Sequence, residues 1–312
     1  MRIADVKFDN YIKGRYYGEK FEVDLRAWEN CLKSTEGMDK VYNLAANMGG
    51  IGFITEVGAE VMYDNVLINT HMLEASRLNK VKRFLFTSSA CVYPTYRQTN
   101  PNLPGLKEED AYPADPDNFY GWEKLFTEKV CEAYQRDHHM DIRVLRYHNI
   151  YGPEGTYKGG REKSPAAICR KVAEATNPGT ITVWGDGRQS RSYCYIDDAI
   201  RGTTALMESS YAKPINIGSN RLVTIDELAD IAIEISGKKI TKEYDTAAPQ
   251  GVRGRNADLT LVKKTLHWEP IVSLEEGVTR TYKWIETMVN KDRKRPFERQ
   301  VPRLETPFVK HS

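Results

Sequence analysis

The sequence predicts an α/β protein with a doubly wound parallel sheet, followed by a smaller α/β domain. Short β-rich runs alternate with segments of helical periodicity from the start of the chain to about residue 150. Two of these runs, KVYNLAA (40–46) and RFLFTSS (83–89), read as continuous apolar strands that helices cover on both faces. A chain of 312 residues that is 40% hydrophobic is also long enough to bury a sizeable core.

The elements between these strands follow from periodicity. Apolar residues recur at helical spacing from residue 60 to 79, and residues 54–78 are predicted to be helical. A loop rich in proline and aspartate (103–118) precedes a second helix at 117–137, and DIRVLRYHNIYG (141–152) is the third apolar strand. Strands and helices therefore alternate through this first region.

The second half of the chain is more mixed. TITVWGDG (180–187) and PINIGS (214–219) are predicted strands. The helix at 224–237 begins with a capping box of Thr224 and Glu227 and stops at Gly237. A last helix covers 273–292, and a basic, proline-containing tail is predicted to be extended. We therefore divide the chain into residues 1–150, residues 151–290 and a tail at 291–312, with segments that can cross between the two domains.

Composition excludes several classes of function. Lys and Arg total 45 against 43 Asp and Glu, and a net charge of +2 provides no broad basic field for nucleic acid or anionic membrane. No apolar run approaches the roughly 20 residues of a membrane span, and no signal peptide is recognisable, so a cytoplasmic location is predicted. The five cysteines and six histidines have neither disulfide nor metal-ligand spacing, and no metal is predicted.

One group of side chains indicates chemistry. Tyr120 and Lys124 lie one turn apart on the predicted helix, so they share a face, and an ammonium there would lower the pKa of the phenol toward that of a general base. Ser89 ends the strand at 83–89, at the carboxyl edge of the sheet where ligands bind. A serine, a tyrosine and a lysine therefore converge on one edge.

With this triad the chain resembles the extended short-chain dehydrogenase/reductase family. The resemblance extends over NLAA before MGGIGF, HNIYGP (148–153), WGDGRQSRSY, and RNADLTLVKKTLHWEP, and covers almost the whole chain. It implies a Rossmann-like first domain, NAD as cofactor with contacts from Tyr120 and Lys124, a nucleotide-sugar substrate, and a homodimer formed by the helices at 54–78 and 117–137.

More specific segments are AANMGGIGFI, SSACVYP, RYHNIYGPEGTYKGGREKSPAAICRK and QGVRGRNAD. They are similar to family members that epimerise GDP-mannose at C3 and C5 to GDP-L-galactose through a transient 4-keto sugar. The resemblance makes Cys91 and Lys163 the base and the acid on opposite faces of the sugar ring, with Lys163 favouring the thiolate form of Cys91. Ser89, Tyr120 and Lys124 complete the predicted catalytic set.

The predicted substrate-binding set follows from the same segments. Arg191 and Arg255 are expected to grip the diphosphate bidentately, and Gly49 and Gly50 to let the backbone approach the sugar. Trp184 is interpreted as a packing residue. The full predicted set is Gly49, Ser89, Asn149, Glu162, Lys163, Lys171, Gln189, Arg191 and Arg255.

The family's opening element is not recognisable in this sequence. There is no G-x-G-x-x-G turn between a first strand and a helix. MRIADVKFDN instead resembles the family's second strand, with Asp5 at the position that binds the adenosine ribose, and FEVDLR resembles the third, with Asp24 near the adenine. A unit of about 30 residues would be missing, which would leave strand edges unpaired and remove the pyrophosphate site.

Three hypotheses remain open at this point. The chain is an NAD-dependent C3 and C5 epimerase or a shortened form of one. Alternatively, it is another nucleotide-sugar 4-epimerase or 4-keto reductase. The third hypothesis is a catalytically silent protein that binds a nucleotide sugar without NAD.

Overall fold

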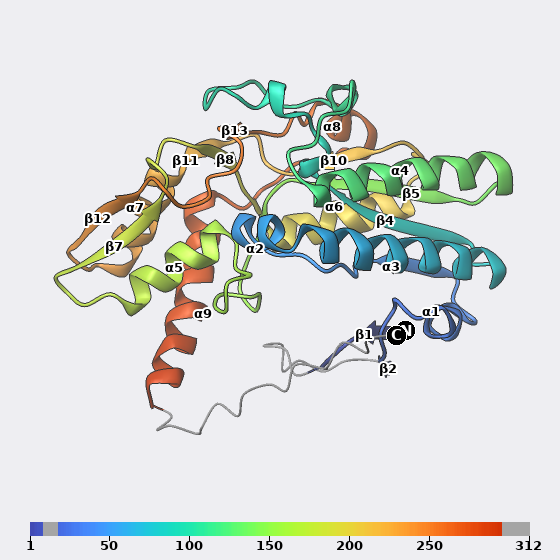
Figure 1. Ribbon diagram of the computed structural model, residues 1–312, viewed down its shortest axis with the longest axis horizontal. Helices are drawn as coiled ribbons and strands as arrows, with labels where there is room; N and C mark the ends of the chain where they lie inside the picture. Colours follow the sequence, from blue (N-terminus) through green and yellow to red (C-terminus); the bar gives the residue numbers. More distant parts are fainter. Residues whose placement is uncertain (9–17, 295–312) are drawn as a thin grey trace, which may run out of the picture.

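The computed structural model describes residues 1–8 and 18–294 as an α/β structure with two regions (Figure 1). The first region is a four-stranded parallel sheet in the order β10-β5-β4-β3. Its strands are β3 (Lys40–Asn43), β4 (Arg83–Ser89), β5 (Ile142–Tyr147) and β10 (Ile215–Ile217). Because β10 follows residue 150 and pairs with β5, the later part of the chain completes the sheet.

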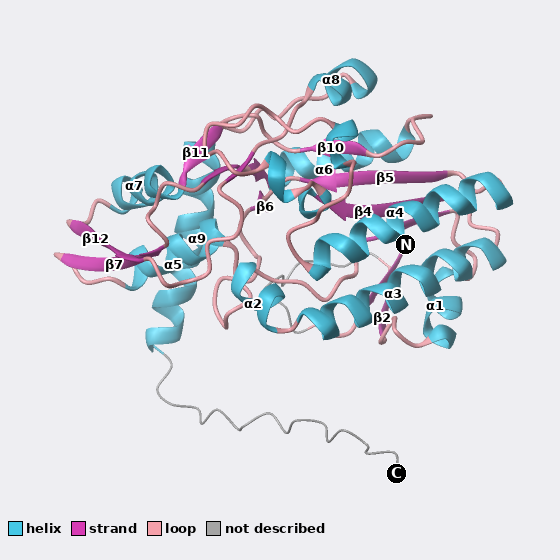
Figure 2. Ribbon diagram, turned by 45° about the horizontal axis from the view of Figure 1, so that its top comes forward, coloured by secondary structure: helices cyan, strands magenta, loops and turns pink. Residues whose placement is uncertain are grey.

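Helices cover both faces of β4, as its apolar sequence predicts. The same prediction is wrong for residues 40–46, because β3 is an edge strand in which Val41 and Asn43 are buried but Tyr42 is 41% exposed. Along β4, Phe84 and Phe86 pack against α3 (Gly58–Leu78) and α4 (Phe119–His138), whereas Leu85 packs against α6 (Ile196–Glu208) and α8 (Thr260–Leu266). Figure 2 shows α3 and α4 on one side of the strands and α6 on the other. Alternate residues of a strand point to opposite faces, so one strand contributes to both layers of the core.

The first two strands form a sheet of their own. β1 (Arg2–Asp5) and β2 (Glu19–Glu22) pair in parallel, and α1 (Trp28–Thr35) then leads to β3. Within the described residues, neither strand joins the four-stranded sheet, and β3 is its edge strand. The unpaired edge that the sequence predicts is therefore confirmed at β3.

Two predicted elements are each divided in two. The predicted helix at 54–78 becomes α2 (Ile51–Glu56) and α3, separated at Val57, whose φ of −120° and ψ of 46° are not helical. The predicted strand at 141–152 becomes β5 and β6 (Ile150–Tyr151), because Asn149 has a φ of 45°. Asparagine tolerates this left-handed backbone region better than most residues.

The second region packs three helices against a two-stranded sheet. It contains α5 (Ser164–Glu174), α7 (Ile225–Ser236), α9 (Leu274–Lys294), β7 (Gly179–Trp184) and β12 (Ile240–Asp245). The predicted capping box of α7 is confirmed, and Gly237 ends the helix with a φ of 65°. Helix α9 reaches Lys294, so it extends into the predicted tail at 291–312, whose residues 295–312 lie outside the described ones.

Short strands connect the two regions. β6 pairs with β9 (Cys194–Tyr195), while β8 (Ser190–Ser192) pairs with β11 (Leu222–Thr224) and β13 (Gly254–Arg255). In the described part of the chain, no helix is both long and apolar enough to cross a membrane.

Candidate active site

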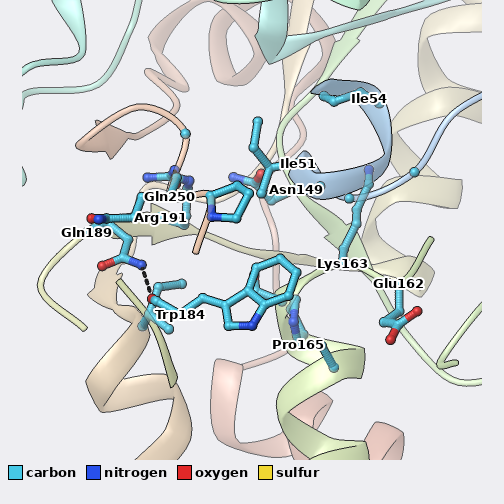
Figure 3. A pocket seen from close by; sticks show the side chains of 18 of the residues that line it. Ile51, Ile54, Asn149, Glu162, Lys163, Pro165, Trp184, Gln189, Arg191 and Gln250 are labelled. Carbon is cyan, nitrogen blue, oxygen red and sulfur yellow. Dashed lines mark hydrogen bonds between the residues drawn. The ribbon is translucent and has the colours of Figure 1, made fainter. Parts of the chain in front are cut away.

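A cavity of about 300 Å³ lies beyond the carboxyl end of β4 and extends to β7 and β8. Figure 3 shows Asn149, Lys163, Trp184, Gln189 and Arg191 around this cavity. The structure brings together most of the predicted site residues here, from separate elements. Those that line the cavity are Gly49, Ser89, Cys91, Tyr120, Asn149, Glu162, Lys163, Lys171, Gln189, Arg191 and Arg255.

Ser89, Tyr120 and Lys124 are adjacent, as the triad requires. The hydroxyl of Ser89 accepts a hydrogen bond from the Cys91 backbone N–H at 3.2 Å, which fixes the turn after β4. Tyr120 follows the helix cap Asn118, whose side chain accepts from the backbone N–H of Gly121 at 2.9 Å. Lys124 lies one turn further on, with its ammonium nitrogen 5.5 Å from the centre of the Tyr120 ring. Lys124 itself is buried behind the cavity wall rather than lining it.

The protonation of this triad differs from the sequence prediction. The pKa of Tyr120 is raised, because burial of the phenol, together with the charges of Cys91 and Glu123, outweighs the hydrogen bond from Ser89. The pKa of Lys124 is lowered, because burial disfavours the ammonium more than Glu123 favours it. The expected lowering of the phenol's pKa is therefore wrong for the protein alone, and desolvation is the physical reason.

Cys91 lies between cationic groups, but its direct partner is not the predicted one. Arg255 donates from Nη1 to the sulfur at 3.2 Å, and from Nε to Gln98 Oε1 at 2.6 Å. Asp117 Oδ2 lies 3.6 Å from the second guanidinium nitrogen of Arg255. Burial lowers the pKa of Arg255, but the charges of Cys91 and Asp117 together raise it by more than burial lowers it. The net shift is therefore upward. The sulfur of Cys91 therefore lies within hydrogen-bond distance of a cationic donor.

Lys163 is the N-cap residue of α5 and follows a loop that α2 holds in place. The backbone N–H of Gly50 donates to the carbonyl of Arg161 at 3.0 Å. A Cβ at Gly50 would lie 2.5 Å from the Glu162 carbonyl oxygen, so this glycine permits a close approach of two backbone segments. Burial lowers the pKa of Lys163, and the nearby Cys91 acts in the opposite direction.

The far end of the cavity holds the remaining cations. The Arg191 guanidinium donates to the carbonyls of Ser190 and Val252, both at 2.7 Å, and burial lowers its pKa to about 10. Lys171 donates to the Thr182 carbonyl at 2.7 Å, and its nitrogen lies 5.6 Å from the centre of the Trp184 ring.

Two buried polar atoms at this cavity lack a hydrogen-bond partner within the described chain. They are Oε1 of Gln189 and Nη2 of Arg255. Gln189 is held by its other amide atom, Nε2, which donates to the Trp184 carbonyl at 2.7 Å, as the dashed line in Figure 3 shows. Buried polar atoms are rarely left unpaired, so Oε1 of Gln189 remains as an acceptor for a ligand, and Nη2 of Arg255, which lies 3.6 Å from Asp117 Oδ2, remains as a donor.

Asp5 and Asp24 lie outside this cavity. Asp5 accepts from the backbone N–H of Lys7 at 3.2 Å. Asp24 accepts from Arg26 at 2.9 Å and 2.6 Å, and this side-chain bond lowers the pKa of Asp24 despite partial burial. A second cavity of about 1090 Å³ adjoins the first and shares Gly49, Ile150 and Lys163 with it.

The sequence interpretation missed three residues of the site. Gln98 and Asp117 hold Arg255, and Glu123 lies next to Lys124. Only Glu123 had a signal in the sequence, since it directly precedes the lysine of the triad. Gln98 and Asp117 come from loops, whose contacts spacing does not predict.

Comparisons with known proteins agree with this geometry. The model of the NAD dependent epimerase/dehydratase family matches residues 6–218. The chain belongs to this family. GDP-mannose 3,5-epimerase of Arabidopsis thaliana is 45% identical over 291 residues, which are 93% of this chain and 76% of that protein. GDP-L-fucose synthase of Escherichia coli is 30% identical over 87% of this chain and 86% of that protein.

Solved structures of this epimerase/dehydratase family have the same fold. UDP-glucose 4-epimerase of Thermotoga maritima, solved with UDP-glucose, superposes with a TM-score of 0.80 at 25% identity, covering 92% of this chain and 91% of that chain. UDP-glucuronic acid 4-epimerase of Bacillus cereus, solved with UDP-glucuronic acid and NAD, has a TM-score of 0.75 at 28% identity, covering 86% and 82%.

Proposed function

We propose that the chain catalyses the NAD-dependent epimerisation of GDP-mannose at C3 and C5 to GDP-L-galactose through a transient 4-keto sugar. The observation that carries the proposal is that Cys91 and Lys163 line the same cavity as Ser89 and Tyr120. A reaction confined to C4 needs only the serine, tyrosine and lysine. Inversion at the neighbouring carbons needs a further base and acid, and this cavity offers both.

The roles of the chain's own residues follow from their positions. Tyr120 takes the proton of the C4 hydroxyl through its phenol oxygen, and the Ser89 hydroxyl orients the sugar oxygen between them. A ketone at C4 acidifies the hydrogens on C3 and C5. The Cys91 sulfur, stabilised as a thiolate by Arg255, removes such a hydrogen as a proton, and the Lys163 ammonium delivers a proton to the opposite face.

The residues present fit the reacting end of NAD. Lys124 and Tyr120 are buried next to one another, and the second cavity of about 1090 Å³ adjoins the sugar cavity at Gly49 and Ile150. When bound, NAD supplies the hydride acceptor at C4 and returns the hydride at the end. Tyr120, which lines the cavity, would contact the nicotinamide end of NAD, and the ammonium of Lys124, buried behind the cavity wall, would act through Tyr120. The described residues include no glycine-rich turn for the pyrophosphate, so only this end of the cofactor is assigned to them.

The diphosphate and nucleotide end of the substrate matches the other side of the cavity. Arg191 and Lys171 supply positive charge, and Arg255 keeps one buried N–H for a ligand oxygen. The unpartnered Oε1 of Gln189 offers an acceptor for an N–H or O–H of the substrate. Together these groups suit an anionic nucleotide sugar.

Replacing Cys91 by Ser tests the proposed reaction against its alternatives. With NAD and GDP-mannose, we expect the variant to lose epimerisation at C3 and C5 but to keep oxidation at C4, read as absorbance at 340 nm. An unaffected reaction would assign the chain to the 4-epimerases or 4-keto reductases. Calorimetric titration with NAD and with GDP-mannose separates both from a silent protein, which would bind only the sugar nucleotide.

We further propose a homodimer formed through α3 and α4. Phe119, Trp122 and Phe126 recur on one face of α4, and Tyr63 is exposed on the neighbouring α3. Each of these residues is at least 42% exposed, so the two packed helices both carry exposed aromatic residues in the monomer. Aromatic side chains are enriched at the centres of protein interfaces.

We propose a cytoplasmic location on the evidence of the thiols. All five cysteines, in the described part of the chain, are free, and four of them are buried in the core. Reduced cysteines are typical of proteins in a reducing compartment.

A further inference from the structure

Lys124 is buried in an environment that disfavours its charge. Its side chain is 1% exposed, and its nitrogen lies 5.0 Å from the centre of the Phe86 ring and 5.5 Å from that of Tyr120. An ammonium without a partner in such a place loses its proton. The proposed function needs this ammonium, so a counter-charge must hold it.

Glu123, the preceding residue of α4, supplies a carboxylate at this position. Its Oε1 lies 3.7 Å from the Lys124 nitrogen, and its side chain is fully buried. Asn65 and Asn69 of α3 donate to its two oxygens from their Nδ2 atoms, at 2.9 Å and 3.2 Å. Both oxygens therefore act as acceptors. Burial raises the pKa of Glu123, while the charge of Lys124 and the hydrogen bonds from Asn65 and Asn69 act in the opposite direction and favour the carboxylate.

The backbone fixes the orientation of Asn65. Its Oδ1 accepts from the Asn47 N–H at 2.6 Å, and its Nδ2 donates to the Asn47 carbonyl at 3.0 Å. If the amide were flipped, its NH₂ group would face the Asn47 N–H and its oxygen would face the Asn47 carbonyl. Asn65 therefore presents an N–H to Glu123. A protonated Glu123 would find no acceptor on that side. This hydrogen bond therefore favours the carboxylate against the cost of burial.

We propose that Glu123 is a positioning residue of the active site, whose carboxylate keeps Lys124 protonated beside Tyr120. The inference rests on the proposed function only for its catalytic consequence, since the ion pair itself is a property of the folded protein. The other titratable groups that face Lys124 are Tyr120 and Cys131 on α4 and Cys91 after β4. Among these partners Glu123 alone is a carboxylate.

The effect of Glu123 acts through the lysine and not directly on the phenol. The negative charge of Glu123 raises the pKa of Tyr120, as does burial, and this alone would oppose proton abstraction. The same charge and hydrogen bond raise the pKa of Lys124 against its burial. The carboxylate therefore preserves the ammonium next to the phenol, although it directly opposes the ionisation of the phenol.

The test is an NMR titration of the chain labelled with ¹³C and ¹⁵N at the lysine side-chain termini, with the Lys124 signal assigned by its loss in Lys124→Arg. In the unsubstituted chain we expect Lys124 to be an ammonium at pH 7. In Glu123→Gln, which has the same shape, we expect the midpoint of Lys124 to fall by about one pH unit or more. The matched control is Glu132→Gln, an exposed carboxylate of the same helix that pairs with Lys129 at 2.7 Å and should leave Lys124 unchanged.

Either of two results would overturn the proposal: a neutral Lys124 at pH 7 in the unsubstituted chain, or an unchanged midpoint in Glu123→Gln. If Glu123→Gln does not fold, the first criterion still decides. The titration needs neither NAD nor substrate, so it separates this proposal from the proposed reaction. Where epimerisation is measurable, its alkaline limb should move to lower pH in Glu123→Gln and return in part in Glu123→Asp, a response that a purely structural role would not produce.

Discussion

Arg255 and Cys91 show how one contact changes the chemistry of a residue. Their side chains are 164 positions apart in sequence, and a guanidinium N–H points at the sulfur at 3.2 Å. A cationic donor stabilises a thiolate, which is the reactive form of cysteine. The reactivity of Cys91 in the protein alone therefore reports on this contact without any requirement for turnover.

We expect Arg255→Met to slow alkylation of Cys91 by iodoacetamide at pH 7 by about tenfold, since tenfold corresponds to about 1.4 kcal/mol of lost thiolate stabilisation. The modified residue is identified by peptide mass spectrometry. The matched control is Arg253→Met, because Arg253 pairs with Asp186 at 2.8 Å, outside the contact with Cys91. Equal alkylation rates in the two variants would contradict the proposal that Arg255 stabilises the thiolate of Cys91.

The titration of Lys163 predicts a loss of activity as the pH rises. Burial lowers the pKa of Lys163 below that of an ordinary lysine, so its ammonium, the proposed acid, is lost at a lower pH than that of an exposed lysine. We expect kcat/KM for epimerisation to fall on the alkaline side below the usual lysine range. Lys163→Arg should move this limb to higher pH, up to the limit set by the ammonium of Lys124, because arginine keeps its proton. A limb that persists unchanged in Lys163→Arg would assign the titration to another group.

The sequence could predict these residues but not their partners. Spacing and strand ends placed Ser89, Tyr120 and Lys124 together, because each lies in or next to a recognisable element, and the family resemblance added Cys91. The same reasoning assigned Arg255 to the diphosphate and expected Lys124 to lower the pKa of Tyr120. Both expectations omit burial and loop contacts, which depend on the folded chain and determine the charges in this site.

At the scale of elements, the loop before α5 depends on its contact with α2. Arg161 stacks its guanidinium 3.8 Å from the centre of the Phe53 ring and donates to Asn47 Oδ1 at 2.9 Å. Together with the backbone bond from Gly50, these contacts fix the segment that carries Lys163. The sequence analysis interpreted Gly49 and Gly50 as allowing the backbone to approach the sugar. In the structure, the Glu162 carbonyl fills the space beside Gly50.

We expect Gly50→Ala to destabilise the protein by about 1–3 kcal/mol and to reduce epimerisation, because the new Cβ would lie 2.5 Å from a backbone oxygen. Differential scanning calorimetry and rate measurements would show both effects. Gly155→Ala is the control, since the Gly152 carbonyl oxygen would lie 4.0 Å from the added Cβ, at an ordinary contact distance. If Gly50→Ala is as stable and as active as this control, the contact between α2 and the loop before α5 does not position Lys163.

At the scale of the whole molecule, the alternating strands and helices predicted the layered sheet. The missing glycine-rich unit predicted unpaired strand edges, and within the described residues β3 is such an edge. The alternating elements did not predict the break at Asn149, because its left-handed conformation depends on tertiary contacts, among them its donation to the Ser192 carbonyl at 2.8 Å. They also did not predict that α2 and α3 separate at Val57. Periodicity identifies elements well, but not their exact bounds.

The exposed aromatic face of α3 and α4 makes a prediction about assembly. We expect the chain to sediment as a dimer, and Trp122→Glu to shift it toward the monomer, because a charge at an apolar interface is costly to desolvate. Ile271→Glu, at a residue that is 72% exposed and far from α3 and α4 in sequence, is the control. A monomer before any substitution would contradict the proposed interface.

The proposed reaction is tested most directly by solvent exchange at the sugar. The chain is incubated with NAD and GDP-mannose in D₂O, and the recovered sugar nucleotides are examined by NMR. Because Cys91 and Lys163 exchange protons with solvent, we expect deuterium at both C3 and C5, and none at C4, to which the original hydride returns. A product inverted at C4 without deuterium at C3 or C5, or GDP-mannose that binds but stays unlabelled, would contradict the proposed epimerisation.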